Sequence, residues 1–282
     1  MPVSPVPSLP KLHGRLLFEC HRAALAWNAV RRRPGGNLRI RRDAGLVRVH
    51  DGEREIFIPH VRGAAHLRGG IAARLDLTAS KYIGGTGYVP REGDVILDIG
   101  AGIGEFTLWC AEAGARVLAF EPDPLACECL ERNTAALPNV RLFPYALWKE
   151  QANLRLHGSA DTSESSLIED GSYARLADTI AWPLDSLPAI SALPVIDFLK
   201  VDGEGVEPEI LAGGIRTLRR TRVIAVDVGA TAKRPNLAAK IETILDSLNF
   251  RPVAHDRDDT ILALNTAMVG PFSNRIGGRQ GS

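Results

Sequence analysis

The chain has 282 residues, of which 45% are hydrophobic and 24% are charged, and its formal net charge is +1. This composition is typical of a soluble globular protein with a sizeable core. A net charge near zero argues against general affinity for nucleic acid, and no run approaches the roughly 18 apolar residues of a membrane span. We therefore expect no nucleic-acid partner and no stable membrane insertion.

The cysteines and the first residues favour a cytoplasmic location. None of the four cysteines has metal-ligand spacing, and Cys127 and Cys129 stand two apart on a predicted helix, so they do not share a face. Free thiols are therefore expected, which fits a reducing compartment. Prolines interrupt residues 1–14, where a secretory signal needs a continuous apolar core. The four cysteines are Cys20, Cys110, Cys127 and Cys129.

Residues 1–75 are predicted to form an N-terminal appendage of a basic helix and short strands. Residues 11–33 have helical periodicity, and residues 38–59 alternate like a hairpin with its turn at Asp51 and Gly52. The basic helix has two interpretations. It binds a membrane surface or an acidic partner, or, as we favour, its apolar side packs on the main domain or on a second copy, giving a homodimer through this segment.

From residue 93 onward, strand and helix patterns alternate. Such alternation predicts an α/β fold with a doubly wound, mostly parallel sheet covered on both faces, and the last two short strands fit an antiparallel hairpin at one edge. The predicted strands are 95–100, 115–122, 139–148, 195–202, 222–230, 251–255 and 260–265. The predicted helices are 105–114, 124–137, 206–220 and 236–250.

A glycine-rich loop follows the first of these strands, with Gly100, Gly102 and Gly104 at alternate positions. Ligands of such sheets bind beyond the carboxyl ends of the strands, and glycine lets a ligand lie against the backbone. A nicotinamide fingerprint needs its third glycine at 105, but Glu105 stands there, where its charge opposes a pyrophosphate at the helix N-terminus. S-adenosylmethionine instead carries an ammonium and a sulfonium, and Asp98 is expected near that ammonium.

The second strand ends at Glu121, about 20 residues beyond the loop, where an acid accepts both ribose hydroxyls of a nucleotide. Dinucleotides and S-adenosylmethionine share this requirement, so Glu121 alone does not choose between them, and a surface acid at a strand end is the simpler alternative. Pro122 and Asp123 are expected to shape the next turn and to cap the following helix.

Two longer stretches resemble known methyltransferases. Residues 98–104 and 119–133, DIGAGIG and AFEPDPLACECLERN, resemble class I S-adenosylmethionine-dependent methyltransferases. The LDSL at 184–187 and the IDFLKVDGEGVEPEILAGG at 196–214 resemble the FkbM family, and the resemblance covers about residues 90–265. It implies a seven-stranded Rossmann-like sheet and methyl transfer, usually to a hydroxyl of a sugar, glycan or secondary metabolite.

The resemblance also implies which residues hold the cofactor. The corresponding positions are Asp98, Gly100, Gly102, Gly104, Glu121, Pro122, Ala146 and Leu147. One departure is Asp227, because the family usually has glutamate at the end of the fifth strand. The expected domains are the appendage at 1–75, a methyltransferase domain at 76–270 with an insertion at about 151–190, and a flexible tail at 271–282.

Acids cluster after the fourth strand. Asp202 and Glu204 are our candidates for a general base that takes the acceptor proton, with Lys200 orienting the carboxylate. Glu207 and Glu209 more simply begin a helix, where the dipole favours acids. His157 and His255 are further candidate bases, although each is more often a surface or a satisfied histidine.

A magnesium ion is a further expectation at this cluster. Some hydroxyl methyltransferases of this fold hold magnesium with acids after the fourth and fifth strands, which correspond to Asp202 and Asp227 here. Oxygen ligands suit magnesium, and Glu204 is available to complete the set.

The polar insertion is interpreted as a lid or rim of the acceptor pocket, with Tyr173 and Trp182 as sugar-stacking surfaces, or else as a disordered connector. Residues 80–90 are expected to close over the methionine end of the cofactor. The leading hypothesis is an S-adenosylmethionine-dependent O-methyltransferase. A nicotinamide-dependent oxidoreductase and a non-catalytic methyltransferase-like binding module are the alternatives.

Overall fold

The computed structural model describes residues 38–158, 165–167, 175–229, 234–253 and 259–268. Four of the expectations concern residues outside these ranges: the basic N-terminal helix with Cys20, Tyr173, His255 and the C-terminal tail. Within the described ranges, no helix combines the length and the apolar character that a bilayer crossing requires.

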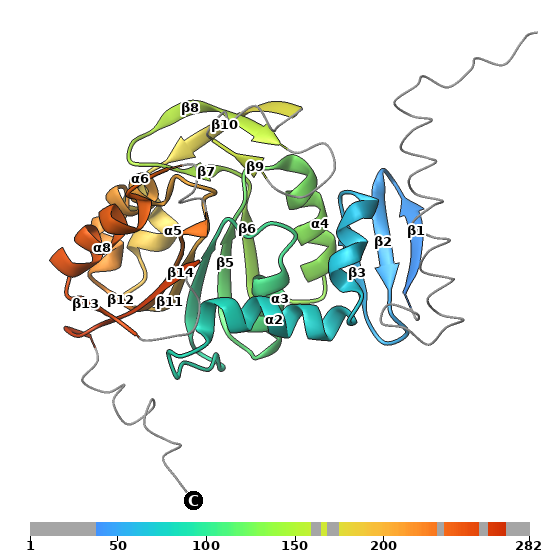
Figure 1. Cartoon of the computed structure of the whole chain (residues 1–282), viewed down its shortest axis with the longest axis horizontal. Coiled ribbons are helices and arrows are strands. Elements are labelled where there is room, and N and C mark those ends of the chain that lie inside the picture. Colours follow the sequence, from blue (N-terminus) through green and yellow to red (C-terminus); the bar gives the residue numbers. More distant parts are fainter. Residues whose placement is uncertain (1–37, 159–164, 168–174, 230–233, 254–258, 269–282) are drawn as a thin grey trace, which may run out of the picture.

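The centre of the molecule is a seven-stranded sheet with strand order β13-β14-β12-β11-β4-β5-β6 (Figure 1). β14 runs antiparallel to β12 and to β13, and the other neighbours pair in parallel. The predicted doubly wound sheet with an antiparallel edge is therefore confirmed. The strands are β4 (Val95–Ile99), β5 (Arg116–Phe120), β6 (Val140–Phe143), β11 (Ile196–Val201), β12 (Thr221–Asp227), β13 (Phe250–Pro252) and β14 (Thr260–Asn265).

Helices cover both faces of this sheet, and alternate residues along each strand pack against the helices on opposite faces. On β4, Leu97 and Ile99 join the apolar cluster beneath α5, α6 and α8, whereas Ile96 joins the cluster beneath α2 and α3. Burial on both faces explains why these strands are continuously apolar in the sequence. The helices are α2 (Ile71–Ile83), α3 (Glu105–Glu112), α4 (Pro124–Thr134), η2 (Leu184–Ser186), α5 (Pro188–Ser191), α6 (Glu207–Ala212), α7 (Ile215–Leu218) and α8 (Leu237–Ser247).

A separate three-stranded antiparallel sheet precedes the central one and contains β1 (Arg39–Asp43), β2 (Leu46–His50) and β3 (Glu55–Ile58). The predicted hairpin is confirmed for β2 and β3, where the Asp51 carboxylate accepts hydrogen bonds from the backbone of Glu53 and Arg54 at 3.0 and 2.8 Å. The prediction was incomplete, because a second tight turn at Ala44 and Gly45, both with positive φ, adds β1.

The small sheet packs against the helices that flank the glycine loop. Its apolar side chains form one buried cluster with Ile103, Leu108 and Cys129. The Asn133 side chain on α4 joins the two parts: it donates to the carbonyl oxygens of Phe57 at 3.0 Å and Ile103 at 2.8 Å, and accepts from the Phe57 backbone at 2.7 Å. The chain then continues through the 3₁₀ helix η1 (Val61–Leu67) into α2, which runs along the central sheet (Figure 1).

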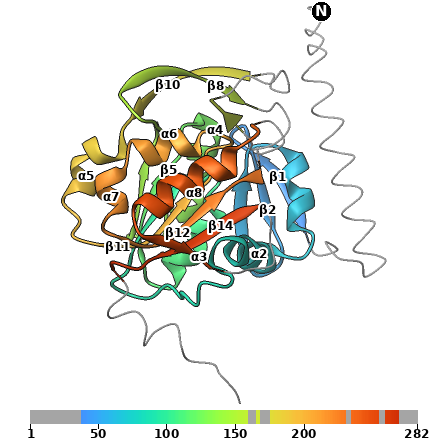
Figure 2. The same ribbon diagram turned by 60° about the vertical axis from the view of Figure 1, so that its left-hand side comes forward.

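The polar insertion is largely a third sheet, of order β7-β10-β8-β9, and not a disordered connector within its described residues. β8 and β10 pair antiparallel over seven residues each, and this sheet arches over the central sheet at the top of Figures 1 and 2. Trp182 packs against the main core, so the expected sugar-stacking role has no support there. The strands are β7 (Ala146–Leu147), β8 (Ala152–Gly158), β9 (Ser165–Ser166) and β10 (Arg175–Trp182).

Candidate active site

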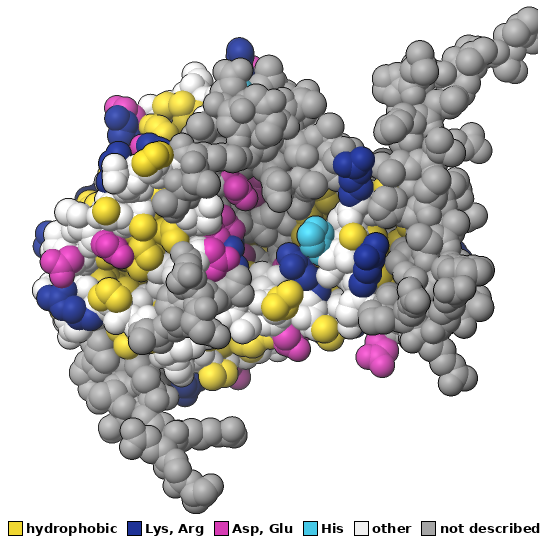
Figure 3. Space-filling view, in the orientation of Figure 1, with side chains coloured by type: hydrophobic (Ala, Val, Ile, Leu, Met, Phe, Trp, Pro, Cys, Tyr) yellow, Lys and Arg dark blue, Asp and Glu magenta, His cyan; other side chains and the backbone are white. Residues whose placement is uncertain are grey.

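A cavity of about 470 Å³ opens beyond the carboxyl ends of β4, β5 and β11. In Figure 3 this face is hollowed near its centre, with acidic side chains on one side and a histidine and basic side chains on the other. The predicted site residues that line it are Gly100, Gly102, Glu121, Pro122, Ala146, Leu147, Lys200, Asp202 and Glu204. Asp98, Gly104 and Asp227 were also predicted as site residues, but they are not among the described residues that line the cavity.

The glycine loop lies in close contact with the loop after β11. Gly100 has a φ of 71°, and a Cβ there would come within 1.8 Å of the Asp202 carbonyl oxygen. The Asp202 backbone in turn donates to the carbonyl oxygen of Ile99 at 3.0 Å. Gly104 is the N-cap residue directly before α3 and has a φ of 90°, and a Cβ there would lie 3.0 Å from Leu130. These glycines therefore permit close packing of the chain.

Asp98 and Lys200 form a buried ion pair beneath this loop. They are register partners on adjacent strands, and their side chains meet at 2.9 Å. Asp98 also accepts from Thr107 at 2.6 Å, and Lys200 also donates to the carbonyl oxygen of Gly100 at 2.7 Å. Although burial alone would lower it, the charges of Asp98 and Asp202 raise the pKa of Lys200. Asp98 thus stabilises the loop from below, and its expected action on a ligand ammonium, through water or backbone contacts, stays a prediction.

The Asp202 carboxylate is oriented by a tyrosine and not, as expected, by Lys200. The Tyr82 hydroxyl on α2 donates to Asp202 Oδ2 at 2.6 Å. Burial and then the Asp202 charge raise the pKa of Tyr82 far above its usual value, so the hydroxyl remains a donor. The tyrosine ring also lies 5.0 Å from the Lys200 ammonium and 4.9 Å from that of Lys81.

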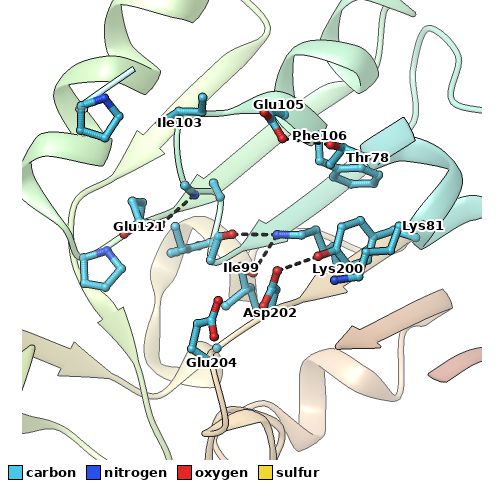
Figure 4. A pocket seen from close by; sticks show the side chains of 18 of the residues that line it. Thr78, Lys81, Ile99, Ile103, Glu105, Phe106, Glu121, Lys200, Asp202 and Glu204 are labelled. Atoms are coloured by element: carbon cyan, nitrogen blue, oxygen red, sulfur yellow. Dashed lines mark hydrogen bonds between the residues drawn. The ribbon is translucent and has the colours of Figure 1, made fainter. Parts of the chain in front are cut away.

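Glu121 lies at the end of β5 with its side chain almost fully buried. Its two oxygens accept from the backbone of Gly102 and of Asp123, each at 2.8 Å. Burial raises the pKa of this carboxyl to about 7, although both hydrogen bonds act in the opposite direction. Asp123 caps α4 by accepting from the Leu125 backbone at 2.8 Å, as predicted. Figure 4 shows Glu121, Asp202 and Glu204 around the same space.

Glu204 has a left-handed backbone, with a φ of 53°, between two glycines. Glu207 holds this turn, because its Oε1 accepts from the backbone of Gly203 at 2.9 Å and of Gly205 at 3.0 Å. Burial raises the pKa of Glu207 to about 7. A non-glycine residue in this region is strained, and such strain concentrates at functional sites. Glu209 instead pairs with Arg234 at 3.1 Å, in line with a structural role.

The expected magnesium site does not fit the arrangement of these acids. Asp227 forms an ion pair with the Lys81 ammonium, and its other oxygen accepts from the Gly229 backbone at 2.7 Å. Burial and then the charge of Asp202 raise the pKa of Asp227. In the described part of the chain, no three His, Cys, Asp or Glu side chains converge as a metal site would require.

Sequence reasoning missed one wall of the cavity. This wall comes from η1, from the residue before it and from α2. Among its residues only Lys81 lies in the segment 80–90 that was expected to close over the methionine end of the cofactor, and the others were assigned no role. They are His60, His66, Arg74, Thr78 and Lys81. The signal was the helical spacing of Arg74, Thr78 and Lys81, which places them on one face of α2. His157, by contrast, is buried on β8 outside the described lining.

Glu105 also lines the cavity, but its charge is compensated. Arg74 Nε donates to both Glu105 oxygens at 2.9 and 3.0 Å, and the Thr78 hydroxyl donates to one of them at 2.9 Å. The electrostatic argument against a pyrophosphate is therefore weaker than the sequence suggested. The missing third glycine still separates this loop from the nicotinamide fingerprint.

Residues 98–252 match the family model for the methyltransferase FkbM domain, and the match covers more than half of the 282 residues. The chain belongs to the FkbM methyltransferase family. The resemblance found in the sequence is thereby confirmed. The matched segment contains the glycine loop, Glu121 and Asp202, and it begins downstream of α2.

Two curated relatives carry specific names. The 2-O-methyltransferase NoeI of Sinorhizobium fredii is 29% identical over 148 residues, which are 46% of this chain and 61% of NoeI. The hexuronic acid methyltransferase AglP of Haloferax volcanii is 26% identical over 165 residues, which are 56% of this chain and 68% of AglP. The chain thus spans less than two thirds of the length of NoeI.

Among solved structures, a precorrin-6y C5,15-methyltransferase from Geobacter metallireducens is similar, with 16% identity and a TM-score of 0.40. The similarity covers 69% of this chain and 88% of that one.

Proposed function

We propose that this protein is an S-adenosylmethionine-dependent O-methyltransferase whose acceptor is a sugar hydroxyl. The observation that carries the proposal is that one cavity is lined both by the glycine loop and Glu121 and by the acids Asp202 and Glu204. Family membership supports methyl transfer, and the names of NoeI and AglP support a hydroxyl of a sugar or a sugar acid.

The residues around the glycine loop fit S-adenosylmethionine. A Cβ at Gly102 would meet nothing within 4 Å, so the backbone here is open to a ligand. Glu121 is placed to accept hydrogen bonds from ribose hydroxyls, and Ala146 and Leu147 supply an apolar surface for the adenine. When bound, the cofactor supplies a methyl group on a positively charged sulfur. Asp98 and Gly104 contribute indirectly, through the shape of the loop.

We assign Asp202 as the general base that takes the proton of the acceptor hydroxyl. Tyr82 occupies one oxygen of this carboxylate, and among the described residues no hydrogen bond occupies the other. That oxygen is therefore available to accept the proton of an acceptor hydroxyl, a contribution of about 10²–10⁴-fold. Glu204, which projects into the same cavity from its strained turn, is the alternative base. Orientation of the acceptor against the donor supplies the rest of the rate enhancement.

Two further parts of the chain line the cavity, and we assign them to the acceptor. Leu156 on β8 and Leu167 directly after β9 belong to the insertion, and His60 and His66 belong to the segment around η1. We place the boundary of the N-terminal unit before Ile71, because α2 spans the boundary expected at residue 75. A cytoplasmic location is part of the proposal and is supported by the buried free thiols of Cys110, Cys127 and Cys129.

Two measurements test the proposal. Titration calorimetry should give heat with S-adenosylmethionine and none with NAD, and the opposite result would favour the oxidoreductase alternative. Radiolabelled methyl donor should then label an acceptor in a panel of sugars, sugar acids and secondary-metabolite hydroxyls. Donor binding with no labelled acceptor across the panel would favour the non-catalytic binding module.

A further inference from the structure

We propose that Lys81 is the built-in cation of the acceptor site, so that methyl transfer by this enzyme needs no divalent metal. Its ammonium would offset the negative charge of Asp202 and Asp227 and hold the acceptor oxygen, which are the roles that a bound magnesium ion would otherwise have. This inference rests on the proposed methyltransferase function and assigns a residue that lies upstream of the family match.

The two acids meet at one edge of the sheet. β11 and β12 are parallel neighbours, and Val201 is the register partner of Val226. Each acid stands one residue further along: Asp202 directly follows β11, and Asp227 is the last residue of β12. Asp227 is only 9% exposed. Two carboxylates close together in a poorly solvated place repel each other, and a nearby cation relieves that repulsion.

Two consecutive residues of α2 contact the two acids. The Lys81 ammonium pairs with Asp227, and the Tyr82 hydroxyl donates to Asp202 at 2.6 Å. The backbone of Gly229 takes the second oxygen of Asp227. A metal ion at this position would have to displace the ammonium from Asp227.

Lys200, the buried lysine of the site, cannot replace Lys81. All of the hydrogen bonds that Lys200 makes within the described residues go to Asp98 and to the carbonyl oxygens of Ile99 and Gly100. The Lys81 side chain is 24% exposed and lines the cavity, so its ammonium is reachable by an acceptor. An ammonium has three donors, and those not used by Asp227 can hold an acceptor oxygen near Asp202.

The first test measures metal binding, with Mn²⁺ as a paramagnetic probe that accepts the same oxygen ligands as magnesium. Electron paramagnetic resonance should find no tight Mn²⁺ site in the wild type or in Lys81→Arg. Lys81→Ala should gain a site, and adding Asp227→Asn should remove it. A Mn²⁺ site in the wild type that disappears in Asp227→Asn would overturn the proposal, whether or not an acceptor is known.

The second test measures turnover. EDTA should leave wild-type turnover unchanged, and Lys81→Ala should lower kcat about 10- to 100-fold while the Kd for S-adenosylmethionine stays within twofold. Lys81→Met keeps the aliphatic stem and should behave in the same way without loss of folding. Lys81→Arg should restore part of kcat. Full turnover in folded Lys81→Met, or loss of wild-type turnover on chelation, would overturn the proposal.

A matched control separates this effect from a general loss of positive charge. Lys240 is exposed on α8 and outside the cavity lining. Lys240→Ala should leave kcat and Mn²⁺ binding as in the wild type. Calorimetry with S-adenosylmethionine tests the proposed function separately. If no donor binding were found, the Mn²⁺ binding result for Lys81 would still stand.

Discussion

The carboxyl group of Glu121 is buried beside the donor loop and has a pKa raised to about 7 by that burial. Ribose hydroxyls donate to the ionised form, so a protonated Glu121 must lose its proton before it can bind them. Affinity for S-adenosylmethionine should therefore rise about tenfold per pH unit up to roughly pH 7 and level off above it. Calorimetry across this range checks the slope.

Glu121→Gln is the control for that titration, because it removes the ionisable group and keeps the size of the side chain. Its affinity should be lower and should show no such slope. A slope that survives in Glu121→Gln would assign the titration to another group, such as the amino group of the cofactor.

The carboxylate of Asp202 is expected to serve the acceptor and not the donor. Asp202→Asn should lower kcat about 10²- to 10⁴-fold, because the amide cannot take the hydroxyl proton. The Kd for the donor should change little. Asp246→Asn on α8, where the side chain is 77% exposed, should leave both quantities unchanged. Equal losses in kcat and donor affinity would place Asp202 in the donor site instead.

Gly100 has almost no room for a side chain. In Gly100→Ala, the new Cβ would meet the Asp202 carbonyl oxygen, and the positive φ would add strain. The free energy of unfolding should fall by about 2–4 kcal/mol. Gly93→Ala has a similar positive φ but nothing within 4 Å, and should cost about 1 kcal/mol. Denaturant titration compares the two, and equal losses would rule out the close approach as the cause.

At the scale of elements, Asn133 ties β3 to the donor loop. Asn133→Ala removes three hydrogen bonds and should lower the free energy of unfolding by about 1–3 kcal/mol, with weaker donor binding as the carbonyl of Ile103 is released. Asn133→Asp keeps only the bond from the Phe57 backbone and should retain part of the stability. Denaturant titration and calorimetry check both variants. Donor affinity unchanged in Asn133→Ala would mean that the loop keeps its shape without this link.

Much of the central sheet was predictable from the sequence. Each of its strands is an apolar run bounded by turn residues, and this local pattern requires no knowledge of distant contacts. The same holds for the cap at Asp123 and for the loop that ends at Gly104. The β1–β2 turn escaped notice because Ala44, unlike the glycine after it, is not a turn residue by type.

Contacts between distant segments were not predictable. Tyr82 and Asp202 are separated by 120 positions, and Lys81 and Asp227 by 146. No spacing rule connects such pairs, so Lys200, the nearest basic residue along the chain, was expected to orient Asp202. The insertion sheet escaped prediction for a similar reason, because β10 pairs with both β7 and β8 across a polar stretch.

At the scale of the whole molecule, the small N-terminal sheet shares its core with the main domain. Side chains of β1, β2 and β3 pack in one cluster with Ile103, Leu108 and Cys129. We therefore expect residues 38–268 to unfold in a single cooperative transition. Far-ultraviolet circular dichroism and the fluorescence of the tryptophans, among them Trp109 beside this cluster, should give coincident curves. Two separate transitions would show that the N-terminal sheet is an independent unit.

The polar face of α2 lies in a stretch that the family match does not include, whereas the nucleotide cradle lies inside it. Under the proposed function, an alignment of family members over the matched region alone compares mainly how they bind the methyl donor that they share. Part of what distinguishes one member's substrate from another's would then be encoded upstream, among the 97 residues that such an alignment discards. Natural variation in specificity can accumulate there while the chemistry of the common cofactor stays untouched.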